Sequence, residues 1–110
     1  MTEACRKERS IVSGMDWMNN DIRRYRLKAY GRVQGVGFRW FVKRLAESQR
    51  LTGFAENEWD GSVTVELQGR TSDIEKVMAA IYRGNIYIDV EHMDAEEIAP
   101  DPHDTGFYTR

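Results

Sequence analysis

Residues 31–39 contain three glycines that lead into an arginine, and such a segment can bind phosphate. It has the sequence Gly-Arg-Val-Gln-Gly-Val-Gly-Phe-Arg and lies between a predicted strand and a predicted helix. Glycines let consecutive backbone N–H groups turn toward one point, where they form an anion-binding nest. The N-terminus of the following helix adds free N–H groups and a partial positive charge. The candidate phosphate ligands are therefore the residues of this turn: Gln34, Gly35, Val36, Gly37 and Phe38.

Arg39 is the candidate side chain of this site. It falls in the first turn of the predicted helix and outside the apolar stripe of that helix. A guanidinium in this position can hold two phosphate oxygens through paired hydrogen bonds. The same pattern is also typical of a tight strand–helix turn followed by a surface arginine. Spacing alone does not decide between these two interpretations.

Hydrophobic periodicity predicts the elements on each side of this segment. Residues 25–30 alternate between apolar and polar types, as in a strand with one face on a core. The apolar residues from Phe38 to Leu45 follow the i, i+3, i+4, i+7 spacing of an amphipathic helix. That helix is predicted to extend to Gln49. Residues 51–68 then predict a β-hairpin with an Asp-Gly turn, a favoured turn dipeptide.

The second half of the chain predicts another helix and another strand. Residues 72–75 resemble a Ser-x-x-Glu capping box, and the helix is predicted to end before Gly84, a residue suited to the left-handed conformation. Residues 86–90 predict a strand. Residues 91–104 contain six acids and no Lys or Arg, so they are interpreted as a solvated strand end and loop. The apolar pair at 107–108 predicts an edge strand.

The resulting order, β-α-β-β-α-β, predicts an α+β fold of the ferredoxin-like, split βαβ type. In that fold both helices cover one face of an antiparallel sheet. Residues 25–110 are expected to form one domain. Residues 1–24 show no hydrophobic period and are expected to be a flexible N-terminal extension.

Composition limits the class of partner. The 110 residues are 31% charged and carry a net charge of −2, which argues against nucleic acid as a partner. The mean hydropathy is −0.63, and no apolar run approaches the about 20 residues that would span a membrane. Cys5 is the only cysteine, so no internal disulfide can form. We therefore expect a cytoplasmic monomer that acts on a small anionic molecule.

Residues 31–39 resemble the signature loop of the acylphosphatase family. That family also carries a Gly-x-x-x-Asn element at the end of its second strand, and Gly53-Phe-Ala-Glu-Asn57 matches it. The resemblance extends over residues 25–90. It implies hydrolysis of the carboxyl–phosphate anhydride of small acyl phosphates, without a metal or another cofactor.

The resemblance also implies a role for each site residue. Arg39 would bind the phosphate together with the loop amides, and Asn57 would orient the attacking water. Read by itself, Asn57 is also typical of a strand end or turn. An acyl phosphate has a good leaving group and a loose transition state, with charge spread over the phosphoryl oxygens. Positioning and electrostatics can therefore carry most of the catalysis.

Other functions fit the residues less well. A non-catalytic phosphate- or protein-binding module on the same fold remains the alternative, since fold does not determine function. RNA recognition would need stacking aromatic residues on a central strand, and residues 63–67 contain none. His92 and His103 do not have the spacing of a zinc site. The acids of residues 91–97 lack the spacing and glycine of a calcium-binding EF-hand loop.

Overall fold

The computed structural model describes residues 21–110, so most of the expected N-terminal extension, residues 1–24, lies outside the described part. The first strand begins at Ile22 rather than at Tyr25. In chain order the elements are β1 (Ile22–Arg32), α1 (Phe38–Ser48), β2 (Thr52–Asn57), β3 (Val63–Arg70), α2 (Thr71–Arg83), β4 (Asp89–Ile98) and β5 (Phe107–Thr109).

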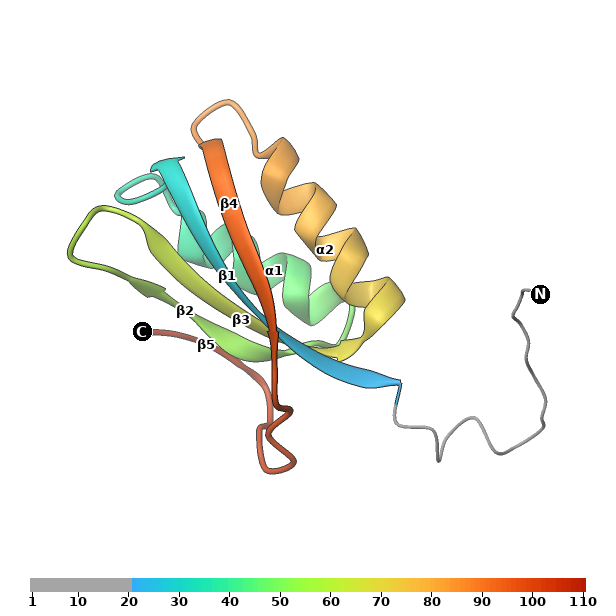
Figure 1. Ribbon diagram of the computed structural model, residues 1–110. Coiled ribbons are helices and arrows are strands. Elements are labelled where there is room, and N and C mark those ends of the chain that lie inside the picture. Colours follow the sequence, from blue (N-terminus) through green and yellow to red (C-terminus); the bar gives the residue numbers. More distant parts are fainter. Residues whose placement is uncertain (1–20) are drawn as a thin grey trace.

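The strands form one sheet in the order β4-β1-β3-β2-β5, and both helices cover the same face of it (Figure 1). The pairs β1–β3, β1–β4 and β2–β3 are antiparallel. The pair β2–β5 is parallel, so the sheet is mixed rather than wholly antiparallel. The predicted ferredoxin-like fold is confirmed, and the predicted edge strand at Phe107 is the strand that makes the sheet mixed.

The core lies between the helices and the covered face of the sheet. Alternate side chains on a strand point to the same face, and the register places Leu27 of β1 opposite Val65 of β3, which in turn lies opposite Ala55 of β2. Full burial of a Leu or Val side chain, such as Leu27 or Val65, contributes about 1.5–3 kcal/mol to stability. The helices turn the stripes expected from the sequence toward the core. The residues of these stripes that are buried are Phe38 and Val42 on α1, and Ile74, Val77 and Ile81 on α2. Phe41, Leu45 and Met78 are half-buried against the core, and Ala46 is buried in addition.

A buried polar network lies on the opposite face of the sheet. Arg24 is only 6% exposed, and its guanidinium contacts Glu66 at 2.8 Å, Gln68 at 3.0 Å and Asp104 at 2.8 Å. Burial lowers the pKa of Arg24, but the hydrogen bonds with Asp104 and Glu66 outweigh burial and raise it. Because Asp104 lies in the connection between β4 and β5, the network holds that connection across the sheet and so guides β5 toward β2.

The segment after α2 differs from the expectation. Residues 86–90 were predicted to form a strand, but only the last two of them belong to β4, and Ile86 is 83% exposed. The side-chain oxygen of Asn85 accepts hydrogen bonds from the backbone N–H groups of Tyr87 and Ile88, at 2.8 and 2.9 Å. These two bonds turn the chain where the prediction placed a strand, because an Asn side chain competes with strand pairing for backbone N–H groups.

The acidic residues beyond this turn form most of β4 instead of a strand end and loop. They lie beside the basic side chains of β1: Arg23 contacts Glu97 at 2.9 Å, and Arg26 contacts Glu96 at 3.4 Å. Opposite charges on neighbouring strands stabilise their pairing. Charged side chains also protect an edge strand from pairing with other chains. An exposed strand of this kind has no apolar alternation, so periodicity did not reveal it.

The start of α2 also corrects a prediction. The capping box at residues 72–75 is not formed, because α2 begins at Thr71 and Arg70 in the N-cap position makes no side-chain capping bond. Strand β3 leads directly into the helix at this point, which leaves no separate capping residue. Gly84 follows α2 with φ 64° and ψ −151°, so its φ is positive but its conformation is not left-handed helical.

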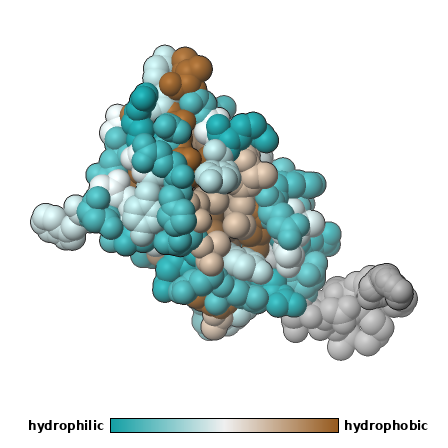
Figure 2. Space-filling view, turned by 45° about the horizontal axis from the view of Figure 1, so that its top comes forward, coloured by the Kyte–Doolittle hydropathy of each residue, from teal (hydrophilic) through white to brown (hydrophobic). Residues whose placement is uncertain are grey.

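Most of the surface in the view of Figure 2 is hydrophilic, with apolar residues at the top of the view and toward its middle. Within residues 21–110, neither helix is long and apolar enough to cross a lipid bilayer.

Candidate active site

The loop that joins β1 to α1 owes its shape to two glycines. Gly35 has φ 76° and Gly37 has φ 78°, values that side chains other than glycine rarely adopt. An added Cβ at either position would meet open space, so glycine is required by the backbone turn and not by crowding. Gly37 is also the N-cap of α1 and leaves the helix end without a side-chain cap. The loop therefore exposes backbone rather than side chains at the start of α1.

The backbone N–H groups of this loop are free to bind an anion. Within residues 21–110, no acceptor is hydrogen-bonded to the N–H groups of residues 34–37. The first bond back into the loop from α1 joins the Phe41 N–H to the Gly37 oxygen at 2.9 Å. The N–H groups before it lack partners within the helix, as at the N-terminus of any helix. With the partial positive charge of the helix end, these donors suit a phosphate group.

Arg39 follows the loop on α1, and its guanidinium is held in place from the residue that follows β5. Its Nη1 atom donates a hydrogen bond of 2.6 Å to the backbone oxygen of Arg110. The N–H of Arg110 in turn donates to the backbone oxygen of Ala55 in β2 at 2.8 Å. The side chain of Arg39 is thus connected to β2 through one residue of backbone.

Asn57 lies at the end of β2, where it pairs with Val63 of β3. Because side chains alternate along a strand, Asn57 shares the helix-covered face with Ala55, which is completely buried. Asn57 itself is exposed, since it extends that row past the core. The end of β2 and the loop before α1 lie at the same end of the sheet (Figure 1). Asn57 therefore lies at the same end of the sheet as the loop amides.

The side chain of Gln34 links the loop to the β2–β3 hairpin. Its Nε2 atom donates to the backbone oxygens of Glu58 at 2.8 Å and Ser62 at 2.9 Å. Both N–H groups of the amide are therefore used within the protein, and the backbone N–H of Gln34 remains for an anion. The sequence predicted Gln34 as a phosphate ligand, and its residue pattern did not indicate the hydrogen bonds to the hairpin.

Asp60 closes the same hairpin from the other side. Its Oδ1 atom accepts hydrogen bonds from the hydroxyl of Ser62 and, at 3.0 Å, from the backbone N–H of Ser62. Its Oδ2 atom lies 3.2 Å from the Lys28 ammonium on β1. The hydroxyl of Ser62, its N–H and then Lys28 together lower the pKa of Asp60 from 3.8 to about 2. The carboxylate is therefore ionised throughout the neutral range and stabilises the turn next to Asn57.

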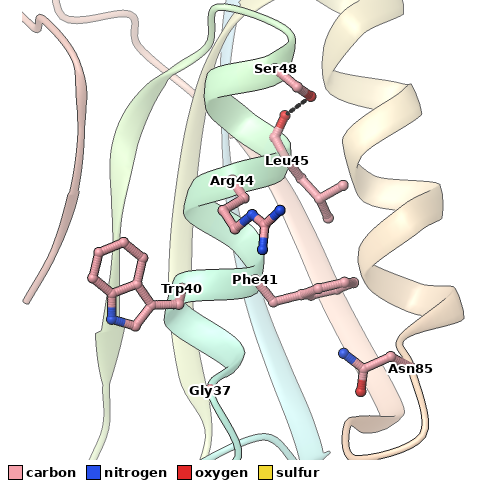
Figure 3. A pocket seen from close by; sticks show the side chains of 7 residues that line it. All are labelled: Gly37, Trp40, Phe41, Arg44, Leu45, Ser48 and Asn85. Carbon is pink, nitrogen blue, oxygen red and sulfur yellow. Dashed lines mark hydrogen bonds between the residues drawn. The ribbon is translucent and has the colours of Figure 1, made fainter.

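A concave feature other than the phosphate loop, here called the α1 hollow, lies along the outer side of α1. Its volume is about 560 Å³, and Phe41 and Leu45 point from α1 toward α2 while Trp40 points the other way (Figure 3). It shares Gly37 with the phosphate loop, but neither Arg39 nor Asn57 lines it. The candidate catalytic side chains Arg39 and Asn57 thus lie outside this hollow. Its lining residues are Gly37, Trp40, Phe41, Arg44, Leu45, Ser48 and Asn85.

The other candidate residues are exposed. His92 is exposed on β4 with its ring nitrogen 2.6 Å from Asp94, and His103 is exposed in the connection to β5. In residues 21–110, no three His, Cys, Asp or Glu side chains are grouped so that they could hold a metal ion. Trp59 at the hairpin tip is fully exposed.

The role of β5 was not foreseen. The sequence indicated an edge strand from the apolar residues Phe107 and Tyr108, but it contained no signal that the backbone of Arg110 would contact Arg39. A backbone oxygen is present at every residue, so no residue type marks the position that will serve as an acceptor.

Comparison with known proteins gives consistent matches. Residues 25–109 match the model of the family described as Acylphosphatase. An acylphosphatase of Clostridium acetobutylicum is 39% identical over 84 residues, which cover 76% of this chain and 92% of that protein. One from Clostridium perfringens is 44% identical over 79 residues, covering 72% and 89%. The crystal structure of acylphosphatase from Bacillus subtilis superposes with a TM-score of 0.76 at 30% identity, covering 80% of this chain and 98% of that one.

Proposed function

This chain belongs to the acylphosphatase family and is an acylphosphatase, and we propose that the loop of residues 34–38, Arg39 and Asn57 carry its reaction. The substrates are small acyl phosphates, which contain a carboxyl–phosphate anhydride. Hydrolysis yields a carboxylate and inorganic phosphate.

The phosphoryl group of the substrate binds to the free N–H groups of the loop and the N-terminus of α1. Arg39 adds paired hydrogen bonds to two phosphoryl oxygens from its position in the first turn. The Arg110 oxygen lies 2.6 Å from Nη1. When the guanidinium binds the phosphoryl group, it either keeps this hydrogen bond or replaces it with one to a phosphoryl oxygen. These donors stabilise the charge that spreads over the phosphoryl oxygens in the transition state.

The amide of Asn57 holds a water molecule in line with the bond that breaks. The water oxygen forms a bond to phosphorus while the bond between phosphorus and the acyl oxygen breaks. The electron pair of that bond leaves with the carboxylate. One proton of the water passes to a phosphoryl oxygen, because an amide cannot accept a proton at neutral pH. The products are RCOO⁻ and H₂PO₄⁻, and the protein needs to supply no general base.

The proposal rests on the way the two halves of the site are joined. Arg39 is connected to β2 through Arg110 and Ala55, and the phosphate loop is connected to the hairpin through Gln34 and Glu58. Asn57 lies between these two connections, one residue before Glu58. This arrangement supports a shared role for the loop, the arginine and the asparagine.

The direct test is phosphate release from benzoyl phosphate in buffer that contains EDTA. We expect turnover by the full chain, competitive inhibition by inorganic phosphate, and strong losses in Arg39→Ala and Asn57→Ala. If the wild-type protein binds phosphate, as seen by NMR shifts of the loop amides, but releases none from benzoyl phosphate, the proposed reaction is contradicted. Full activity in both variants would instead contradict the site.

We also propose that the enzyme acts in the cytoplasm as a monomer and does not bind nucleic acid. The single cysteine fits a reducing compartment, and the net charge of −2 gives no basis for binding a polyanion. Sedimentation equilibrium at micromolar concentration should return the mass of one chain, 12.8 kDa. A concentration-dependent rise toward twice that mass would contradict the monomer.

A further inference from the structure

We propose that Gln34 is a positioning residue: its side chain holds the hairpin that carries Asn57 at a set distance from the phosphate loop. This inference rests on the proposed roles of the loop and of Asn57. It assigns the Gln34 side chain to the hairpin and leaves only its backbone N–H for the substrate.

The hydrogen bonds of Gln34 fix the orientation of its amide. Nε2 lies 2.8 Å from the Glu58 oxygen and 2.9 Å from the Ser62 oxygen. An amide nitrogen carries two N–H groups, so both donors are used here. The opposite orientation would place the amide oxygen against two carbonyl oxygens, which repel it. The side chain therefore binds the hairpin and cannot donate to phosphate at the same time.

The two carbonyls that Gln34 contacts belong to one closed turn. The Glu58 N–H donates to the Ser62 oxygen at 2.8 Å, and the Gly61 N–H donates to the Glu58 oxygen at 3.2 Å. Gln34 thus binds both ends of the turn from outside. Asn57 directly precedes Glu58, so a shift of the Glu58 backbone moves the backbone of Asn57 with it.

Gln34 joins the two groups whose separation the reaction depends on. Its backbone belongs to the loop that binds the phosphoryl group, and its side chain contacts the carbonyl of Glu58, the residue directly after the one that holds the water. A displacement of about 1 Å between reacting groups can reduce a rate by about 100-fold. Loss of this side chain should therefore reduce kcat while the loop still binds phosphate.

The test replaces Gln34 by Met, which has a similar length but no donor. We expect kcat on benzoyl phosphate to fall about tenfold, while the Ki of inorganic phosphate changes by less than about twofold. Gln49→Met is the matched control, because Gln49 follows α1 at its far end and should keep kcat within about twofold. Gln34→Glu is a second variant of the same size. Its carboxylate would face both carbonyls, so its kcat should fall at least as far.

A double-mutant cycle separates positioning from a general loss of structure. If Gln34 acts through Asn57, then Gln34→Met in the Asn57→Ala background should change kcat by less than about twofold. Multiplicative losses in the double variant would overturn the inference. So would a Ki for phosphate that rises as far as kcat falls, since that pattern indicates a direct phosphate contact or a disordered loop.

The outcomes distinguish this inference from the function on which it rests. If Asn57→Ala is fully active, the proposed role of Asn57 fails and takes the positioning role with it. If Asn57→Ala is impaired while both Gln34 variants keep the wild-type kcat, only the positioning role fails.

Discussion

The guanidinium of Arg39 donates a 2.6 Å hydrogen bond to the backbone oxygen of Arg110, a residue 71 positions further along the chain. A free arginine side chain samples many rotamers, and fixing one costs about 1.5–2 kcal/mol of conformational entropy. The contact with Arg110, the residue that follows β5, restricts the rotamers of Arg39 independently of substrate. A guanidinium ordered in this way loses less entropy when it binds phosphate. The end of β5 thus positions Arg39 through the backbone oxygen of the next residue.

Removal of the Arg39 guanidinium should remove most of the activity. Arg39→Ala is expected to lower kcat/KM on benzoyl phosphate by at least about 100-fold, or about 3 kcal/mol, as for a lost donor to transition-state charge. Arg44→Ala is the matched control, because Arg44 lies on the same helix and lines the α1 hollow instead of the phosphate loop. It should keep kcat/KM within about twofold. Equal losses in the two variants would show that the helix needs positive charge in general and not Arg39 itself.

Asn57→Ala should affect turnover more than phosphate binding. The amide is proposed to orient water, so we expect kcat to fall about 100-fold while the Ki of inorganic phosphate stays within about twofold. Asn57 is exposed at the end of β2, and its replacement should leave the thermal unfolding midpoint almost unchanged. A Ki that rises in parallel with the loss of kcat would instead place Asn57 among the phosphate ligands.

The contribution of the segment at the end of β5 can be tested at the backbone of Arg110. Proline at position 110 has no N–H to donate to Ala55, so Arg110→Pro should shift the oxygen that Arg39 contacts. We expect kcat/KM to fall about tenfold. Arg110→Ala keeps the N–H and the oxygen but removes the guanidinium that lies 3.8 Å from the Phe54 ring, and it should remain within about twofold of the wild type. Comparable losses in both variants would assign the effect to the Arg110 side chain.

The hairpin turn should give a stability difference that depends on pH. Hydrogen bonds from Ser62, with a smaller contribution from Lys28, lower the folded-state pKa of Asp60 from 3.8 to about 2. A carboxyl with a depressed folded-state pKa stabilises the fold above its unfolded-state pKa, and this contribution disappears as pH falls through the folded-state value. Asp60→Asn should therefore be less stable than the wild type at pH 6. The two urea unfolding midpoints should approach each other between about pH 4 and pH 2. A difference that stays constant over this interval would show that ionisation of Asp60 does not stabilise the turn.

Much of the fold follows from short-range patterns. The apolar stripe from Phe38 to Leu45 and the alternation in residues 25–30 predicted α1 and β1, because each pattern repeats within a few residues. The charged part of β4 beyond residue 90 escaped detection, since an edge strand can be exposed along both faces and then has no apolar alternation. Its partner is β1, more than 50 residues earlier, and the matching charges are recognisable only once the pairing is known.

The sequence by itself determined which residues are candidates for the site. The glycines at 35 and 37 specify a backbone with positive φ, which is a local property set by residue type. The resemblance of residues 31–39 and 53–57 to the family's motifs implied the proposed roles of Arg39 and Asn57 toward phosphate and water. Only the tertiary structure decided where those side chains are held: Arg39 against the backbone of Arg110, and the phosphate loop against the hairpin through Gln34. Both acceptors are backbone oxygens brought close by folding, and a backbone oxygen has no signature in the sequence.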